Sequence, residues 1–157
     1  MIRFRYLALV LLAAAACTPT VPAPESPAPA TPMPMPGQTG DLAAARARWQ
    51  ARKPASYAYS FSVTCFCIHR GEYAVEVRDG RITSLRTADT GAAVPEDRAQ
   101  YILTVDALFD RIATASREGT PVRATYDAAL GYPVEAEVGL LANDSGTLYR
   151  ITSLRPL

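Results

Sequence analysis

The strongest constraint on the fold is a regular alternation of apolar and polar residues. Every second residue from Tyr57 to Cys65 is apolar, and the residues between them are small or polar. Shorter stretches alternate in the same way at 73–78, 122–127 and 134–138. Successive side chains of a strand point to opposite faces, so alternation is typical of antiparallel strands with one wet face. The sequence therefore predicts an antiparallel sheet.

Two other segments have the spacing of amphipathic helices. The first begins after Asp41, a good N-cap residue, and ends near Lys53. The second begins after Thr104, and Gly119 can end it. Each segment has one apolar stripe, so we expect both helices to pack on one face of the sheet. The predicted fold class is α+β, an antiparallel meander sheet with two helices packed on one face, in a single domain at 41–157.

A repeated hexapeptide suggests how this domain is organised. The sequence "RITSLR" occurs at 81–86 and again at 150–155, each time after a helical segment and two alternating segments. This pattern predicts an internal α-β-β-β duplication. Asp79-Gly80, just before the first copy, predicts a type I′ hairpin turn.

The amino-terminal residues predict export. Arg3 and Arg5 precede an apolar run that ends at Ala16 and is shorter than the roughly 20 residues that span a bilayer. Residues 1–16 are therefore predicted to be a signal peptide. The end of the run, "LLAAAAC", resembles the bacterial lipobox, in which the cysteine after the cleavage site is lipidated; here that cysteine is Cys17. There are two alternatives. An ordinary signal peptidase could cleave the chain here, or Cys17 could stand at this position by chance.

The next segment predicts a spacer between this cysteine and the domain. Residues 18–40 contain eight prolines, which fix φ and donate no backbone hydrogen bond. Residues 17–40 are thus predicted to be a lipidated cysteine with a Pro-rich spacer that reaches on the order of 60 Å when extended. The expected location is the bacterial cell envelope, lipid-anchored to a membrane and facing outside the cytoplasm.

The composition excludes some partners. The 157 residues are enough for one ordinary domain, and hydrophobic residues make up 49% of them. Residues 41–157 carry 14 basic and 14 acidic side chains, without a basic stripe. Nucleic acid is therefore not an expected partner.

The stretch "TCFCIH" (64–69) has three interpretations. If Cys17 takes lipid, Cys65 and Cys67 remain as an even pair in an exported protein, which favours a structural disulfide. In a straight strand their Cα atoms would lie about 6.6 Å apart, so a bulge or strand end at Phe66 would ease the bridge. The second interpretation is a redox pair. The third is a metal site with His69, for which the backbone must turn, because a straight strand would separate Cys65 from His69 by about 13 Å.

The stretch "YDAALGYP" (126–133) is the second candidate site. A hairpin loop in which Asp127 caps its own turn explains it without any function. The functional interpretation is a small binding surface made by Tyr126, Asp127 and Tyr132. We find no pattern typical of a catalytic set, a phosphate loop or a bound cofactor.

Several short motifs together resemble an uncharacterised bacterial lipoprotein family of unknown function. They are Trp49, Tyr57, Cys65-Phe66-Cys67, "LFDRI" (108–112), "TYD" (125–127) and "GYP" (131–133). The resemblance implies an exported α+β domain and no known activity. Family members often carry more acidic residues near the last hairpin, where this chain keeps only Asp144, so no acidic site is carried over.

These observations predict a membrane-anchored envelope lipoprotein that binds or supports an envelope protein or ligand, without catalysis. The alternative is a thiol–disulfide or metal-handling module built on Cys65 and Cys67. A third hypothesis is an inhibitor of an envelope enzyme that presents the open face of the sheet.

Overall fold

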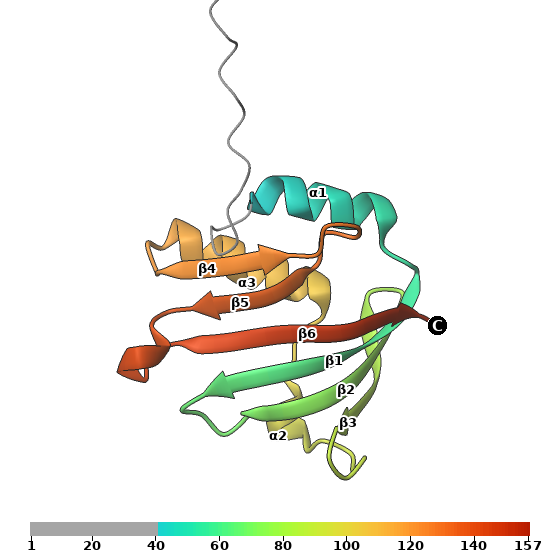
Figure 1. Cartoon of the computed structure of the whole chain (residues 1–157). Coiled ribbons are helices and arrows are strands. Elements are labelled where there is room, and N and C mark those ends of the chain that lie inside the picture. The colour runs from blue at the N-terminus through green and yellow to red at the C-terminus, as the bar shows by residue number, and fades with distance from the viewer. Residues whose placement is uncertain (1–40) are drawn as a thin grey trace, which may run out of the picture. The chain divides into compact units, whose positions relative to one another are not determined.

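The structure, a computed structural model, describes residues 41–157 (Figure 1). In chain order the elements are α1 (Leu42–Arg52), β1 (Ser56–Cys65), β2 (Gly71–Arg78), β3 (Arg81–Thr87), α2 (Glu96–Ala99), α3 (Val105–Arg117), β4 (Val122–Tyr126), β5 (Pro133–Val138), the 3-10 helix η1 (Leu141–Asn143) and β6 (Thr147–Pro156). The predicted signal peptide, the predicted lipid attachment at Cys17 and the predicted spacer lie outside the described residues. Within 41–157, no helix has both the length and the apolar character needed to cross a membrane.

The six strands form one sheet in the order β3-β2-β1-β6-β5-β4. All neighbouring strands are antiparallel. The first three strands form one meander, the last three form a second, and the two join where β1 pairs with β6 (Figure 1). The predicted α+β class with an antiparallel sheet is confirmed.

The core lies on one face of β1. Its large buried side chains alternate as predicted, at Tyr57, Tyr59, Phe61 and Val63, and the small Ala58 between the first two is also buried. Trp49 of α1 is fully buried and meets the ring of Tyr57 edge-on, with centroids 5.3 Å apart. Helix α3 packs on β4 and β5, and Phe109 stacks on Tyr126. Helix α1 contacts α3 and reaches the sheet through Trp49.

Both predicted helices begin at their predicted caps. The Asp41 carboxylate accepts hydrogen bonds from the backbone N–H groups of Ala43 and Ala44, and the Thr104 hydroxyl accepts one from Ala107. These bonds satisfy donors that have no partner inside the helix. The short helix α2 was not predicted. It has no side-chain cap and no buried residue, so neither a cap nor an apolar stripe marks it in the sequence.

The two copies of "RITSLR" lie on β3 and β6 and have different surroundings. Strand β3 is an edge strand, where Ile82 is only partly buried, whereas β6 is central and the equivalent Ile151 is buried. Both strands have a register irregularity against their neighbour. An origin by duplication stays a prediction.

Candidate functional site

The connection between β1 and β2 is the first candidate site. Strand β1 ends at Cys65 and β2 begins at Gly71, and we refer to residues 66–70 between them as the tip loop. A disulfide joins Cys65 to Cys67, whose Cα atoms lie 5.3 Å apart. This is shorter than the roughly 6.6 Å of a straight strand because the chain bends immediately after Cys65. The disulfide thus fixes the start of the tip loop.

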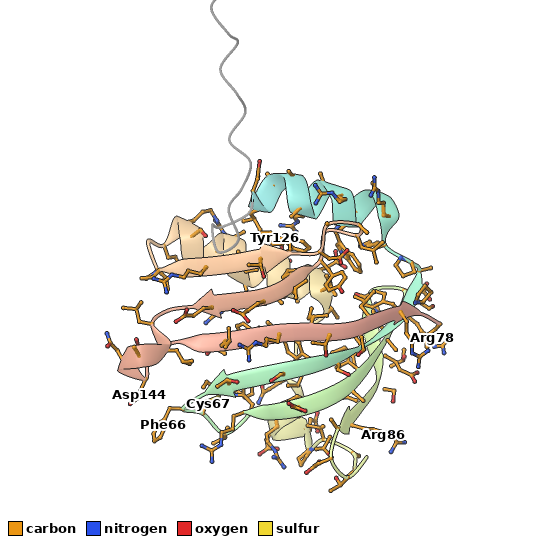
Figure 2. All side chains as sticks on the ribbon, in the orientation of Figure 1. Phe66, Cys67, Arg78, Arg86, Tyr126 and Asp144 are labelled. Carbon is orange, nitrogen blue, oxygen red and sulfur yellow. A yellow bond between two sulfur atoms is a disulfide. The ribbon has the colours of Figure 1, made fainter. Side chains whose placement is uncertain are left out.

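Two large apolar side chains of the tip loop face outward. Phe66 is 82% exposed and Ile68 is 69% exposed. Figure 2 shows Phe66 beyond the end of β1, pointing away from the sheet. We did not predict this exposed pair from the sequence, but the sequence does contain a sign of it. If the alternation of β1 is continued, both residues fall on the polar face of the strand, with Ser62 and Thr64.

The middle of the tip loop is fixed to the rest of the domain through His69. The imidazole stacks on the ring of Tyr101, with centroids 4.4 Å apart and planes 13° from parallel. The backbone carbonyl of His69 accepts a hydrogen bond of 2.8 Å from the hydroxyl of Tyr73. Burial lowers the pKa of His69, which favours the neutral ring at neutral pH.

The turn also brings three metal-ligating side chains together. The sulfur atoms of Cys65 and Cys67 and a ring nitrogen of His69 all lie within 4.8 Å of one another. The expected separation of about 13 Å between Cys65 and His69 does not apply, because it assumed a straight strand. Among residues 41–157, this is the one such group whose ligand atoms are close enough to share an ion.

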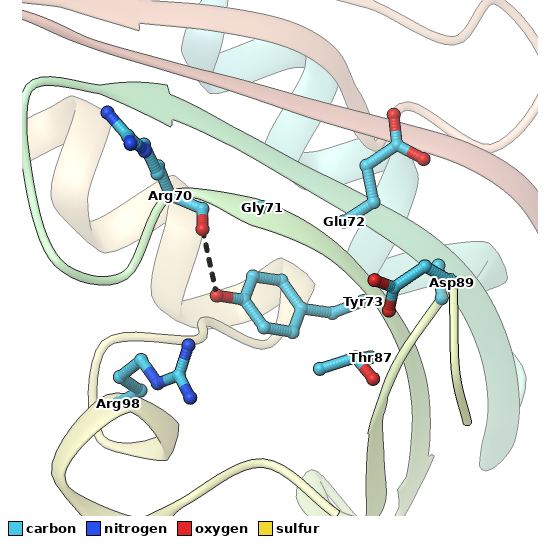
Figure 3. A pocket seen from close by; sticks show the side chains of 8 residues that line it. Arg70, Gly71, Glu72, Tyr73, Thr87, Asp89 and Arg98 are labelled. Atoms are coloured by element: carbon cyan, nitrogen blue, oxygen red, sulfur yellow. Dashed lines mark hydrogen bonds between the residues drawn. The ribbon is translucent and has the colours of Figure 1, made fainter. Parts of the chain in front are cut away.

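A cavity of about 460 Å³ lies behind the tip loop (Figure 3). Arg70 and Arg98 line it together with Glu72 and Asp89, so its charges balance. The hydroxyl of Tyr73 lies inside the domain between these groups, and burial raises its pKa more than the charge of Arg98 lowers it. The phenol of Tyr73 therefore stays protonated and keeps its hydrogen bond to the tip loop. Because the charges of the lining balance, the cavity favours neither anionic nor cationic ligands.

The loop between β4 and β5, residues 127–132, is the second candidate site. One carboxylate oxygen of Asp127 accepts hydrogen bonds from the backbone N–H groups of Ala129 (3.0 Å) and Leu130 (2.6 Å). The backbone of Asp127 also pairs with Tyr132 and with Gly131, each at 2.9 Å. This carboxylate therefore holds its own turn.

The two tyrosines of the second candidate site also have partners inside the domain. The ring of Tyr126 is stacked on Phe109, with centroids 5.9 Å apart, and burial raises the pKa of its hydroxyl to about 12. The ring of Tyr132 meets the ring of Trp49 at 6.3 Å. A binding role for Tyr126, Asp127 and Tyr132 stays a prediction, and their observed contacts are structural.

Comparison with known proteins gives a family and no activity. No curated protein and no solved structure matches the chain significantly. The model of DUF6174, described as a family of unknown function, matches residues 41–156, which is nearly the whole described domain. The chain therefore belongs to this family of unknown function.

Proposed function

We propose that the protein is an exported lipoprotein of the cell envelope that binds another envelope protein through its tip loop. Lipidation of Cys17 would anchor the chain, and the Pro-rich spacer would carry the domain away from the membrane surface. The lipobox resemblance and the charged, short apolar start support export.

The observation that carries the binding role is the exposure of Phe66 and Ile68. Large apolar side chains are usually buried, and neighbouring exposed ones often mark an interaction site. Burying either of them in a complex would contribute about 1.5–3 kcal/mol. The Cys65–Cys67 disulfide and the contacts of His69 already restrict the loop, so less conformational entropy would be lost on binding.

The charge of the loop points to the chemistry of the partner. Arg70 is exposed and lines the same hollow as Phe66 and Ile68, while no carboxylate lies in residues 65–70. A complementary protein surface would offer an apolar depression with acidic residues at its rim. We favour a protein over the anchoring membrane because the spacer would hold the domain at a distance from that membrane.

Site-specific photocrosslinking tests this role in cells that make the full-length lipoprotein. The photoreactive amino acid p-benzoylphenylalanine replaces Phe66 in one sample and the exposed Arg117, at the end of α3, in the control. We expect one discrete protein adduct from position 66, weakened by Ile68→Ser, and none from position 117. Adducts to lipid alone, or equal adducts from both positions, would contradict a protein partner at the tip loop.

The anchor is tested separately by Cys17→Ala. If Cys17 is the lipidated residue, this change moves the protein from the membrane fraction to the soluble fraction and removes the acyl mass. An unchanged fractionation would refute the anchor without bearing on the tip loop.

A second candidate function is thiol–disulfide exchange at Cys65 and Cys67. It is favoured by the position of the disulfide, which lies at a loop end with both cysteines only partly buried. Equilibration with a dithiol buffer would test it: a module of this kind would be reduced by a mild dithiol, whereas a purely structural bridge would resist reduction.

A further inference from the structure

The tip loop and the end of β1 together hold a set of donor atoms that the proposed contact through Phe66 and Ile68 does not use. We propose that, when the Cys65–Cys67 disulfide is reduced, the two thiolates and the imidazole of His69 bind one copper(I) ion. This site goes beyond the proposed binding role, because its donor atoms belong to Cys65, at the end of β1, and to two other side chains of the tip loop.

The backbone already places the three donors at nearly the required distances. Metal–sulfur and metal–nitrogen bonds of about 2.0–2.3 Å put neighbouring ligand atoms roughly 3.5–4 Å apart. In the structure the three ligand atoms lie within 4.8 Å of one another. Once the sulfur atoms are no longer bonded to each other, small side-chain rotations suffice, and the fold of the loop need not change.

The position of His69 and its free ring nitrogens suit it to act as a metal ligand. Stacking on Tyr101 and the hydrogen bond from Tyr73 to its carbonyl fix the position of His69. Within residues 41–157, neither ring nitrogen of His69 makes a hydrogen bond, and one of them lies within 4.8 Å of both sulfur atoms. One nitrogen is thus available for an ion.

The donor set selects a soft ion. Two sulfurs and one imidazole nitrogen suit copper(I), and the group contains no carboxylate oxygen of the kind that magnesium and calcium require. Structural zinc sites use four protein ligands, whereas three soft ligands can complete the shell of copper(I). Zinc with a bound water as fourth ligand is the competing occupant.

The surrounding charges fit the product. Copper(I) bound to two thiolates carries one net negative charge. Arg70 lines the same hollow as Cys67, and no carboxylate lines that hollow. The guanidinium group of Arg70 would offset part of that charge.

Metal binding follows reduction in two balanced steps. A dithiol reductant transfers two electrons and two protons to the Cys65–Cys67 bond and is itself oxidised to a disulfide. The ion then replaces the two thiol protons, which are released to solvent. Because the bridged sulfur atoms are not thiolates, the oxidised loop should not bind, so the redox state of the pair would control metal binding.

The test is an anaerobic copper(I) titration of the full chain carrying Cys17→Ala, so that Cys65 and Cys67 are its only thiols. The protein is reduced with a phosphine, and bicinchoninate serves as a competing chromophoric chelator. We expect one ion per reduced chain, no competitive binding by the oxidised chain, and X-ray absorption that reports two sulfurs and one nitrogen. His69→Ala should weaken binding at least about tenfold, whereas Ile68→Ala in the same loop should leave it unchanged.

Four results would overturn the inference: no stoichiometric binding, equal binding by oxidised protein, a sulfur-only shell with unchanged affinity in His69→Ala, or tighter binding of zinc in a parallel competition. If His69→Ala folds poorly, the X-ray absorption spectrum of the chain with His69 in place still shows which atoms coordinate the ion. The single variant Ile68→Ser should bind copper(I) normally while weakening the crosslinked adduct from position 66, so failure of one proposal leaves the other intact.

Discussion

The tip loop and the β4–β5 loop both join antiparallel strands and both carry aromatic residues, yet they are used in opposite ways. In the tip loop, Phe66 and Ile68 point to solvent while the backbone is fixed by a disulfide and a histidine. In the β4–β5 loop, Tyr132 turns inward onto Trp49. An aromatic residue in a loop thus indicates function only when the domain itself leaves it uncovered.

The close packing of the β4–β5 loop is clearest at Gly131. A Cβ atom at this position would lie 2.4 Å from the backbone carbonyl oxygen of Ala45, and φ is +88°. The loop is therefore pressed against α1 and has no space for a ligand at that point. The tip loop has no such covering.

The largest effect should come from Gly131→Ala. Positive φ and the clash with the α1 backbone together should lower the free energy of unfolding by about 3 kcal/mol. Gly91→Ala is the matched control, because Gly91 also has positive φ, +67°, but nothing lies within 4 Å of the methyl group that the substitution would add. It should cost only about 1 kcal/mol. Urea unfolding measures both, and equal losses would show that the loop is not packed as described.

A smaller loss is expected for Asp127→Ala. Removing the carboxylate leaves the N–H groups of Ala129 and Leu130 without their acceptor, which should cost about 1–2 kcal/mol. Asp127→Asn keeps an acceptor oxygen and should lose less than about 0.5 kcal/mol. The same unfolding assay separates the two variants. A binding role for the charge of Asp127 would instead make Asp127→Asn as harmful as Asp127→Ala to function, with little effect on stability.

The partly buried side chain of Tyr126, at the start of this loop, predicts an effect of alkaline pH on stability. The pKa of Tyr126 rises from 10.0 to about 12 on folding, so the folded state holds this proton more tightly than the unfolded state does. Its contribution is fully present below pH 10 and is lost as the pH rises toward 12. Compared with Tyr126→Phe, the wild-type protein should therefore lose stability more steeply between pH 10 and pH 12. Parallel slopes in urea unfolding at these pH values would contradict the burial of this hydroxyl.

The smallest stability effect is expected in the tip loop. Phe66→Ser/Ile68→Ser changes two exposed side chains, so the free energy of unfolding should stay within about 0.5 kcal/mol of the wild-type value. A loss above about 2 kcal/mol, found in the assay used for Gly131→Ala, would mean that these side chains pack against the domain.

The sequence predicted the local features of the fold and missed the non-local ones. The caps at Asp41 and Thr104 and the alternation of β1 depend on neighbouring residues, and the structure contains them. At Asp79 and Gly80 φ is positive, as a type I′ turn requires. The pairing of β1 with β6 joins residues far apart in the chain. Alternation predicts which side chains of a strand share a face, but it does not predict which other strand pairs with it.

For the candidate site at the tip loop, the sequence pointed to the residues Cys65, Cys67 and His69, but it did not predict the turn that brings them together. The turn that brings His69 back to the cysteines lies in "FCIH", which contains neither glycine nor proline. It is fixed by Tyr101, which lies far along the chain, and by Tyr73, which is close in sequence but belongs to β2. From the sequence we therefore expected the turn only as a condition for a metal site, and a strand end at Phe66 as a condition that would ease the disulfide; β1 does end at Cys65.

The most direct test of the central claim, that the tip loop and not the β4–β5 loop meets a partner, is carbene footprinting of the full-length protein in intact cells and after purification. We expect Phe66 and Ile68 to be labelled strongly in the purified protein and to lose most of that labelling in cells, while the labelling of Tyr132 stays the same. Protection of Tyr132 with unchanged labelling of Phe66 and Ile68 would contradict the account.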